Sequence, residues 1–268
     1  MKKTLIAVAA AAALVSSAFA EITFGSWGRV IAVPVASNGD DTVALQTQSW
    51  GGYGRAIGLD INGQDAEGKA GFSMAYRNNT KGDAQTGEQA HFWVKPTDQI
   101  KVVIGKTENN TLRGDFCYGS WNWIRPGNWL YEDEGLTMSN FNNTGLLIEA
   151  TPVEGLYVQA AVPYTDTAVE AEDVYKKAQA GFAYTIDGVG KIKGQYLGKG
   201  DDKTIEAAFD LSAVENLYVT AGFQYNMFDE GKSVALASLD PSSVQNTMKI
   251  ALGASYQASD ALKVSVSG

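Results

Sequence analysis

The sequence predicts an all-β fold, a transmembrane antiparallel up-and-down β-barrel, from three observations. Apolar and polar residues alternate with a period of two along nearly the whole chain. Short turns and longer polar connections follow each other in alternation. After the N-terminal leader no run of about 18 apolar residues, the minimum for a membrane helix, occurs. Because hydrocarbon admits only helices and closed sheets, these observations together favour a barrel.

The leader is the first element of the chain. Two lysines follow Met1, an apolar run extends from Leu5 to Val15, and Ala18 and Ala20 supply small residues for cleavage. This pattern is typical of a secretory signal peptide, so we expect residues 1–20 to be removed on export.

Charge and cysteine content exclude two classes of protein. The chain has 21 basic and 30 acidic side chains, a net charge of −9, and loss of the two leader lysines makes it −11. Such an acidic protein is a poor partner for nucleic acid. A single cysteine, Cys117, excludes an intramolecular disulfide framework.

The alternation predicts thirteen strands in the rest of the chain. Residues 217–226 are the clearest case, because Leu, Val, Ala, Phe and Tyr alternate there with Tyr, Thr, Gly, Gln and Asn. The predicted strands cover residues 21–33, 51–62, 69–78, 89–95, 99–106, 142–151, 155–163, 176–186, 190–197, 204–212, 216–226 and 246–257, with a last one from 261. Since bacterial single-chain barrels have even strand numbers, we interpret the chain as the N-terminal part of a protein with about 16 to 18 strands.

The connections are of two kinds. A short turn recurs in "KPTDQIKVVIG", "ATPVEGLYVQA", "LSAVENLYVTA" and "QASDALKVSVS", and Asp187-Gly188 forms another. Such turns join antiparallel neighbours. The longer connections cover residues 35–50, 79–88, 107–141, 165–175 and 227–245, with 198–203 as a brief member of the same set. Turns at one end and loops at the other are typical of an outer-membrane barrel.

A soluble β-sandwich also alternates apolar and polar residues and is the main alternative fold. The polar positions here are rich in Gly, Ala, Ser and Gln, and no Greek-key order is evident. A β-propeller needs a regular repeat of about 40 to 45 residues, which the unequal spacing of the turns does not supply.

This combination of signal peptide, tight turns and long loops resembles the bacterial outer-membrane general, or diffusion, porins. The longest loop, 107–141, is entered by "KVVIGKTENNTLRGDFCYG", which is similar to the entry of the family's third loop. The resemblance implies a signal peptide at 1–20, a barrel at 21–268 that is incomplete at its C-terminus, and a pore-constricting loop at 107–141. The family's Pro-Glu-Phe-Gly-Gly segment and its C-terminal aromatic residue are absent.

The resemblance also implies a function and the residues that carry it. We expect a water-filled channel in the bacterial outer membrane for passive diffusion of small hydrophilic solutes and ions, with an acidic loop facing basic wall residues. The expected constriction and selectivity residues are Glu132, Asp133, Glu134, Asp115, Arg113 and Arg125 of the loop, and Arg29, Arg77 and Lys101 of the strands. The alternation of the strands also directs eight other charged side chains toward the lumen, namely Lys191, Lys193, Lys249, Lys263, Asp60, Glu149, Glu206 and Asp210. The acidic loop favours cations and the basic wall residues counteract that preference, so we expect weak ion selectivity.

Aromatic residues concentrate in the same loop. Tyr118, Trp121, Trp123, Trp129 and Tyr131 either pack the loop against the wall or stack on sugar rings. The second reading makes a sugar-selective porin the nearest alternative function. A non-channel exported β-protein, an adhesin or a sandwich, is the other alternative.

Catalysis is not expected. A barrel hydrolase needs an activated serine or an acid–histidine pair, and His91 is the only histidine. One histidine and one cysteine form no recognisable zinc set, and no phosphate-binding glycine motif is intact. We therefore predict no enzyme activity, no cofactor and no nucleic-acid partner. Outer-membrane lipid, solutes and ions are the expected partners, and a homotrimer is one candidate assembly beside the monomer.

Overall fold

The computed structural model describes residues 21–37, 42–48, 55–79, 84–109, 111–112, 141–164, 171–228, 246–259 and 262–267. The described residues up to Glu108 form one compact unit, and those from Asn109 onward form a second. The two units are described separately below.

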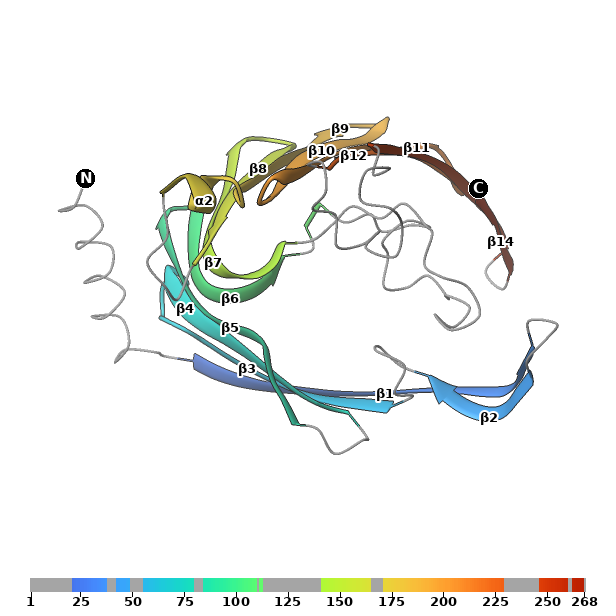
Figure 1. Cartoon of the computed structure of the whole chain (residues 1–268), viewed down its shortest axis with the longest axis horizontal. Helices are drawn as coiled ribbons and strands as arrows, with labels where there is room; N and C mark the ends of the chain where they lie inside the picture. Colours follow the sequence, from blue (N-terminus) through green and yellow to red (C-terminus); the bar gives the residue numbers. More distant parts are fainter. Residues whose placement is uncertain are drawn as a thin grey trace. The chain divides into compact units, whose positions relative to one another are not determined.

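The first unit is a six-stranded antiparallel sheet in the order β2-β1-β3-β4-β5-β6 (Figure 1). Its strands are β1 (Glu21–Ser37), β2 (Thr42–Gln48), β3 (Arg55–Gln64), β4 (Ala70–Asn79), β5 (Ala84–Thr97) and β6 (Ile100–Asn109). Apart from the β2 edge, each strand pairs with the next one along the chain, which is an up-and-down arrangement.

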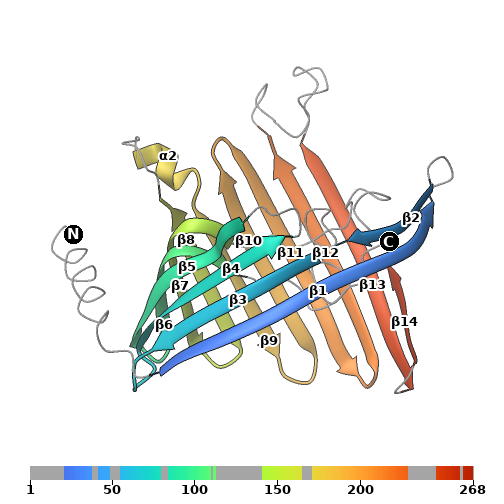
Figure 2. The same ribbon diagram turned by 90° about the horizontal axis from the view of Figure 1, so that it is seen from below.

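The second unit continues the same connectivity in eight strands, which lie side by side in Figure 2. They are β7 (Phe141–Val153), β8 (Leu156–Pro163), β9 (Gln179–Ile186), β10 (Gly190–Lys199), β11 (Asp202–Val214), β12 (Leu217–Met227), β13 (Thr247–Ser259) and β14 (Leu262–Ser267), with helix α2 (Ala171–Tyr175) before β9. Every described pair is antiparallel. The predicted all-β, antiparallel up-and-down class is confirmed.

The period of two divides each sheet into an apolar face and a polar face. In β11, Ile205 and Phe209 lie on the apolar face, whereas Thr204, Glu206 and Asp210 lie on the polar face and are buried. The other buried polar side chains on polar faces are His91, Thr107, Asn109, Gln159, Lys193, Gln195, Thr220 and Ser255. The prediction that Lys193, Glu206 and Asp210 lie on the same face of the sheet is therefore confirmed.

The apolar face is exposed rather than packed. Phe24 is 72% exposed and Ile250 is 65% exposed, and other large apolar side chains on nearly every strand are also exposed. Examples are Leu59, Met74, Phe92, Ile148, Phe182, Ile192, Ile205, Met248, Leu252, Tyr256, Val264 and Val266. Soluble monomers rarely expose contiguous apolar surface of this extent, so this face requires an apolar environment.

Two of the tight turns share one geometry. Gly155 and Asn216 occupy the same position in the repeats "ATPVEGLYVQA" and "LSAVENLYVTA", and their φ angles are 76° and 62°. Glycine and asparagine are the residues that accept this left-handed conformation most readily. The sequence repeat therefore encodes a repeated backbone turn.

An ion pair joins two turns of the first unit. The ammonium of Lys69, at the end of the β3–β4 turn, donates to the carboxylate of Asp98 in the β5–β6 turn. The hydrogen bond from Lys69, together with its positive charge, holds the pKa of Asp98 below its ordinary value.

Strand β2 was not predicted, because residues 35–50 read as a loop. Pro34 lacks an amide hydrogen and suggests the end of a strand. In the structure Val33 pairs with Gln46 and Val35 pairs with Ala44, so β1 passes the proline and forms a hairpin with β2. The other thirteen described strands correspond to the predicted ones.

Several boundaries also differ. Strand β6 continues through Thr107 to Asn109, the first residues of the predicted 107–141 loop, and β7 begins at Phe141. The predicted 165–175 connection ends in α2, where the Lys176 ammonium lies 2.9 Å from the Asp201 carboxylate of the β10–β11 turn. This hydrogen bond raises the pKa of Lys176. Among the described residues no helix is long and apolar enough to cross a membrane.

Candidate functional site

One register row crosses the polar face of the second unit. Direct cross-strand pairing runs through seven strands, β7 to β13. Its members are Glu149, Gln159, Gly181, Gln195, Glu206, Gln224 and, by backbone register alone, Lys249. Directly opposed side chains on one face interact, so this row is a belt of amide and carboxylate groups that is interrupted at Gly181 and ends at Lys249.

Glu206 is the centre of the belt and is only 2% exposed. The Gln195 amide donates to one of its carboxylate oxygens, and the Gln224 amide donates to the other at 2.6 Å. A carboxylate with a donor on each oxygen is held in one orientation. The charge therefore has a fixed position on the polar face.

The bonds continue along the neighbouring row. The Asn226 amide donates to Gln224 at 3.2 Å and to Thr247 at 3.1 Å, and the Thr204 hydroxyl donates to Asn226 at 2.9 Å. Strands β11, β12 and β13 are thus joined by side chains as well as by their backbones.

A buried ion pair lies two residues before Gln195 on β10. The Lys193 ammonium is 2.6 Å from one Asp210 oxygen, and the Thr220 hydroxyl donates to the other at 2.7 Å. Lys193 is 3% exposed, so its charge is compensated within the protein rather than by bulk water.

The start of the long connection is bonded to the same face. The Asn109 amide donates to the Glu149 carboxylate at 2.9 Å, and the Tyr157 hydroxyl donates to the same oxygen at 2.8 Å. The side-chain oxygen Oδ1 of Asn109 accepts from the backbone amide of Thr111 at 2.9 Å, which turns the chain at that point.

Leu112 then fills a gap in the register row. It is 2% exposed, and a Cβ atom at Gly181 would lie 2.3 Å from its Cδ1 atom. Because Gly181 has no side chain, Leu112 packs over β9 beside Gln195. The first described residues of the long connection therefore lie on the polar face.

On the first unit, Trp93 is the prominent side chain of the polar face. The ammonium groups of Lys95 and Lys101 lie 5.3 and 5.8 Å from its ring centroid. Both distances are within the range of a cation–π contact. Lys101, predicted from parity as a wall residue, thus lies on the polar face beside an indole.

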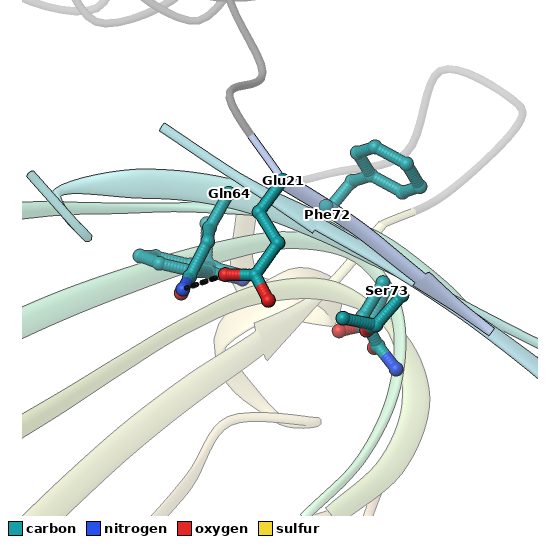
Figure 3. Close-up of a pocket in the computed structure, with 8 residues that line it drawn as sticks. Glu21, Gln64, Phe72 and Ser73 are labelled. Carbon is teal, nitrogen blue, oxygen red and sulfur yellow. Dashed lines mark hydrogen bonds between the residues drawn. The ribbon is translucent and has the colours of Figure 1, made fainter. Parts of the chain in front are cut away.

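A cavity of about 280 Å³ lies beside Trp93 at the turn end of this face. Its polar lining comes from Glu21 and Thr23 of β1, Asn62 and Gln64 of β3, and Ser73 of β4. Figure 3 shows Glu21 and Gln64 joined by a hydrogen bond, which is 3.3 Å long, with the Phe72 ring directed away from them.

The structure places only part of the predicted site. Glu132, Asp133, Glu134, Asp115, Arg113, Arg125, Tyr118, Trp121, Trp123, Trp129, Tyr131 and Cys117 lie outside the described residues. Arg29 pairs with Ala56 and Arg77 pairs with Gly58 through the backbone. His91 is buried on the polar face, with Nδ1 3.2 Å from the carbonyl oxygen of Lys106.

Neutral side chains were missed by the sequence reasoning, which weighed charges and loop aromatics. The missed residues are Asn109, Leu112, Tyr157, Gln195, Gln224 and the cavity lining around Trp93. The available signal was parity, because each amide lies on the same face as the predicted charges. Within the described ranges no three His, Cys, Asp or Glu side chains form a group suited to a metal ion.

No family model and no curated protein matches the chain. Among solved structures, it is similar over 92% of its residues to a mutant of Rhodopseudomonas blastica porin, with 15% identity, 93% of that chain covered and a TM-score of 0.48. It is also similar over 89% of its residues to Pseudomonas aeruginosa OccD3, with 12% identity, 55% of that chain covered and a TM-score of 0.49. A third similar structure is a loop-deletion form of OmpT, an outer membrane protein of Vibrio cholerae, with 14% identity, 89% of each chain covered and a TM-score of 0.36.

Proposed function

We propose that the chain is a bacterial outer-membrane porin that forms a water-filled channel for passive diffusion of small hydrophilic solutes and ions. The observation that carries this proposal is the division of the strands into an exposed apolar face and a polar face with fixed hydrogen-bonded groups. A lipid bilayer accommodates the first face, and an aqueous lumen accommodates the second.

Strand length supports the same proposal. Apart from β1, β2 and β14, the described strands have 8 to 14 residues, and a tilted strand needs about 9 to 11 residues to cross the hydrocarbon. Because an unpaired sheet edge is too costly in lipid, a membrane location requires a closed barrel in the functional protein.

The constriction belongs to the proposal as well. Asn109 and Leu112 bring the chain onto the polar face immediately before residues 113–140. This supports a path for the loop inside the lumen, where Glu132, Asp133 and Glu134 would oppose Arg29 and Arg77.

Weak ion selectivity follows from the way the wall charges are compensated. Lys193 neutralises Asp210, and the Glu206 and Glu149 carboxylates are held by hydrogen-bond donors from neighbouring strands. An ion pair projects a weaker field into a lumen than an isolated charge, and the two carboxylates, which neutral donors leave charged, oppose the basic residues of the polar faces.

The test is single-channel recording from the mature protein folded into planar bilayers. Discrete conductance steps and a reversal potential close to zero in a salt gradient are expected. Folded, inserted protein without steps would refute the channel, and a strongly anion-selective reversal potential would refute the expected charge arrangement.

Cys117 allows a separate test of the loop path. A thiol reagent should lower the conductance of the wild type and leave that of a Cys117→Ser variant unchanged. Complete labelling with unchanged current would place the loop outside the pore. Cross-linking in membranes distinguishes the two candidate assemblies, a homotrimer and a monomer.

A further inference from the structure

The cavity beside Trp93 is formed by four neighbouring strands of the first unit. Its lining includes the carboxylate of Glu21, the amides of Asn62 and Gln64, and the hydroxyl of Ser73. The lining is completed by Thr23, Gly63, Phe72 and the indole of Trp93. One concave space of about 280 Å³ therefore offers several donors, several acceptors and an aromatic surface.

The hollow has a direct cause in the sequence. Glu21, Gln64, Gly71 and Trp93 follow one another in a single register row. Gly71 contributes no side chain to this row, and the indole leans over it, since a Cβ atom there would lie 2.5 Å from Cζ2 of Trp93. Because Gly71 has no side chain, the indole lies over it and forms one side of the hollow, which Asn62, Gln64 and Ser73 also line.

The indole is held in place from the side of the β5–β6 turn. Lys95 and Lys101 approach the ring to 5.3 and 5.8 Å, and attraction between an ammonium and an aromatic face restrains both partners. A restrained aromatic wall lowers the entropic cost of binding a ligand against it.

The charges near the cavity select the type of ligand. The Glu21 carboxylate repels an anion, whereas a cation is repelled by the two ammonium groups beside Trp93 and by the α-ammonium that removal of residues 1–20 would leave on Glu21. A neutral ligand with many hydroxyl groups avoids both penalties, because each hydroxyl both donates and accepts hydrogen bonds. Its carbon-bound hydrogens suit the face of an indole.

We propose that this cavity is a binding site for a neutral, polyhydroxylated six-membered ring, that is, a monosaccharide. The volume lies just below the range for drug-sized ligands, about 300 to 1,000 Å³, which fits a smaller molecule. This names a solute class for the proposed channel, and only the consequence for transport rests on the channel itself.

The test is equilibrium binding of methyl β-D-glucopyranoside to the folded protein in detergent micelles, followed by saturation-transfer NMR. We expect saturable binding with a dissociation constant on the order of 1 mM. The Trp93→Ala variant should bind at least about tenfold more weakly, which corresponds to the loss of about 1.4 kcal/mol.

Trp27→Ala is the matched control. Trp27 lies on the polar face over Gly58 but does not line the cavity, so its removal should leave binding unchanged. Ser73→Met, which fills the cavity and keeps the indole, should abolish binding and serves if Trp93→Ala does not fold. Absence of saturable binding, an equal loss in the two tryptophan variants, or displacement of the glucoside by sulfate would each overturn the site.

Bilayer recording separates this inference from the proposed function. Glucoside binding in micelles without conductance refutes the channel and keeps the site. Conductance without glucoside binding refutes the site and keeps the channel.

Discussion

Lys193 and Asp210 form an ion pair on the polar face of the second unit, with Nζ 2.6 Å from Oδ2 and the lysine side chain 3% exposed. The pair is diagonal, because Lys193 is directly opposite Ala208 and Asp210 is directly opposite Lys191. A pair of this kind leaves an uncompensated charge when one member is removed.

We expect Lys193→Met to lower the free energy of unfolding by about 3 kcal/mol, because Asp210 would lose its ammonium partner and keep the hydrogen bond from the Thr220 hydroxyl. The double variant Lys193→Met with Asp210→Leu should recover most of that loss. Urea unfolding in lipid vesicles measures both. A single variant as stable as the wild type would mean that water compensates Asp210.

The contact between Leu112 and Gly181 predicts coupled substitutions. Gly181→Ala should destabilise by about 1 to 3 kcal/mol, because its Cβ would meet Leu112 at 2.3 Å. Leu112→Ala should cost about 2 to 3 kcal/mol through lost packing. The double variant should cost at least about 1 kcal/mol less than the sum, and strict additivity in the cycle would contradict the contact.

The exposed apolar face predicts a depth-dependent penalty for charge. Ile250→Lys should destabilise the protein in vesicles by about 2 to 4 kcal/mol, because the new ammonium would enter hydrocarbon. Gln257→Lys, on the polar face of the same strand, should change stability by less than about 1 kcal/mol. Equal effects of the two lysines would argue against a lipid-facing surface.

The repeated turn predicts unequal effects at equivalent positions. Asn216→Gly should be nearly neutral, whereas Asn216→Val should cost about 1 to 2 kcal/mol, because a branched side chain resists a φ of 62°. Gly155→Ala should cost more than Asn216→Ala, since its Cβ would lie 2.7 Å from the Thr185 carbonyl oxygen. Vesicle unfolding ranks the four variants, and the reverse order would contradict the turn geometry.

The sequence predicted the faces of the strands well, because side-chain direction follows directly from a period of two. The described side chains assigned inward by parity, such as Lys193, Glu206 and Asp210, do share one face. Strand existence followed from the same pattern. Strand β2 was missed because residues 35–50 were interpreted as a long polar connection, whereas Val35 to Ser37 pair with Thr42 to Ala44 in a hairpin.

Specific contacts were not predictable in the same way. Asn109 and Glu149 are 40 positions apart, and their hydrogen bond depends on the relative register of several strands. The fit of Leu112 over Gly181 likewise requires knowing where the chain turns after β6. A small residue inside a strand signals that space exists but does not identify the side chain that fills it.

The tight turns have a consequence for assembly of the sheet. The carbonyl oxygens of Lys69, Gly155, Val189 and Asn216 accept backbone hydrogen bonds from Lys95, Thr185, Ser212 and Gln257, in that order. In each case the turn of one hairpin receives the first or last rung of the next hairpin. A turn that has formed therefore offers a carbonyl oxygen at a fixed position. Pairing with this oxygen sets the strand register of the next hairpin. Growth by such local additions keeps the separation of contacting residues short and leaves a single growing edge open to the wrong partner at any time.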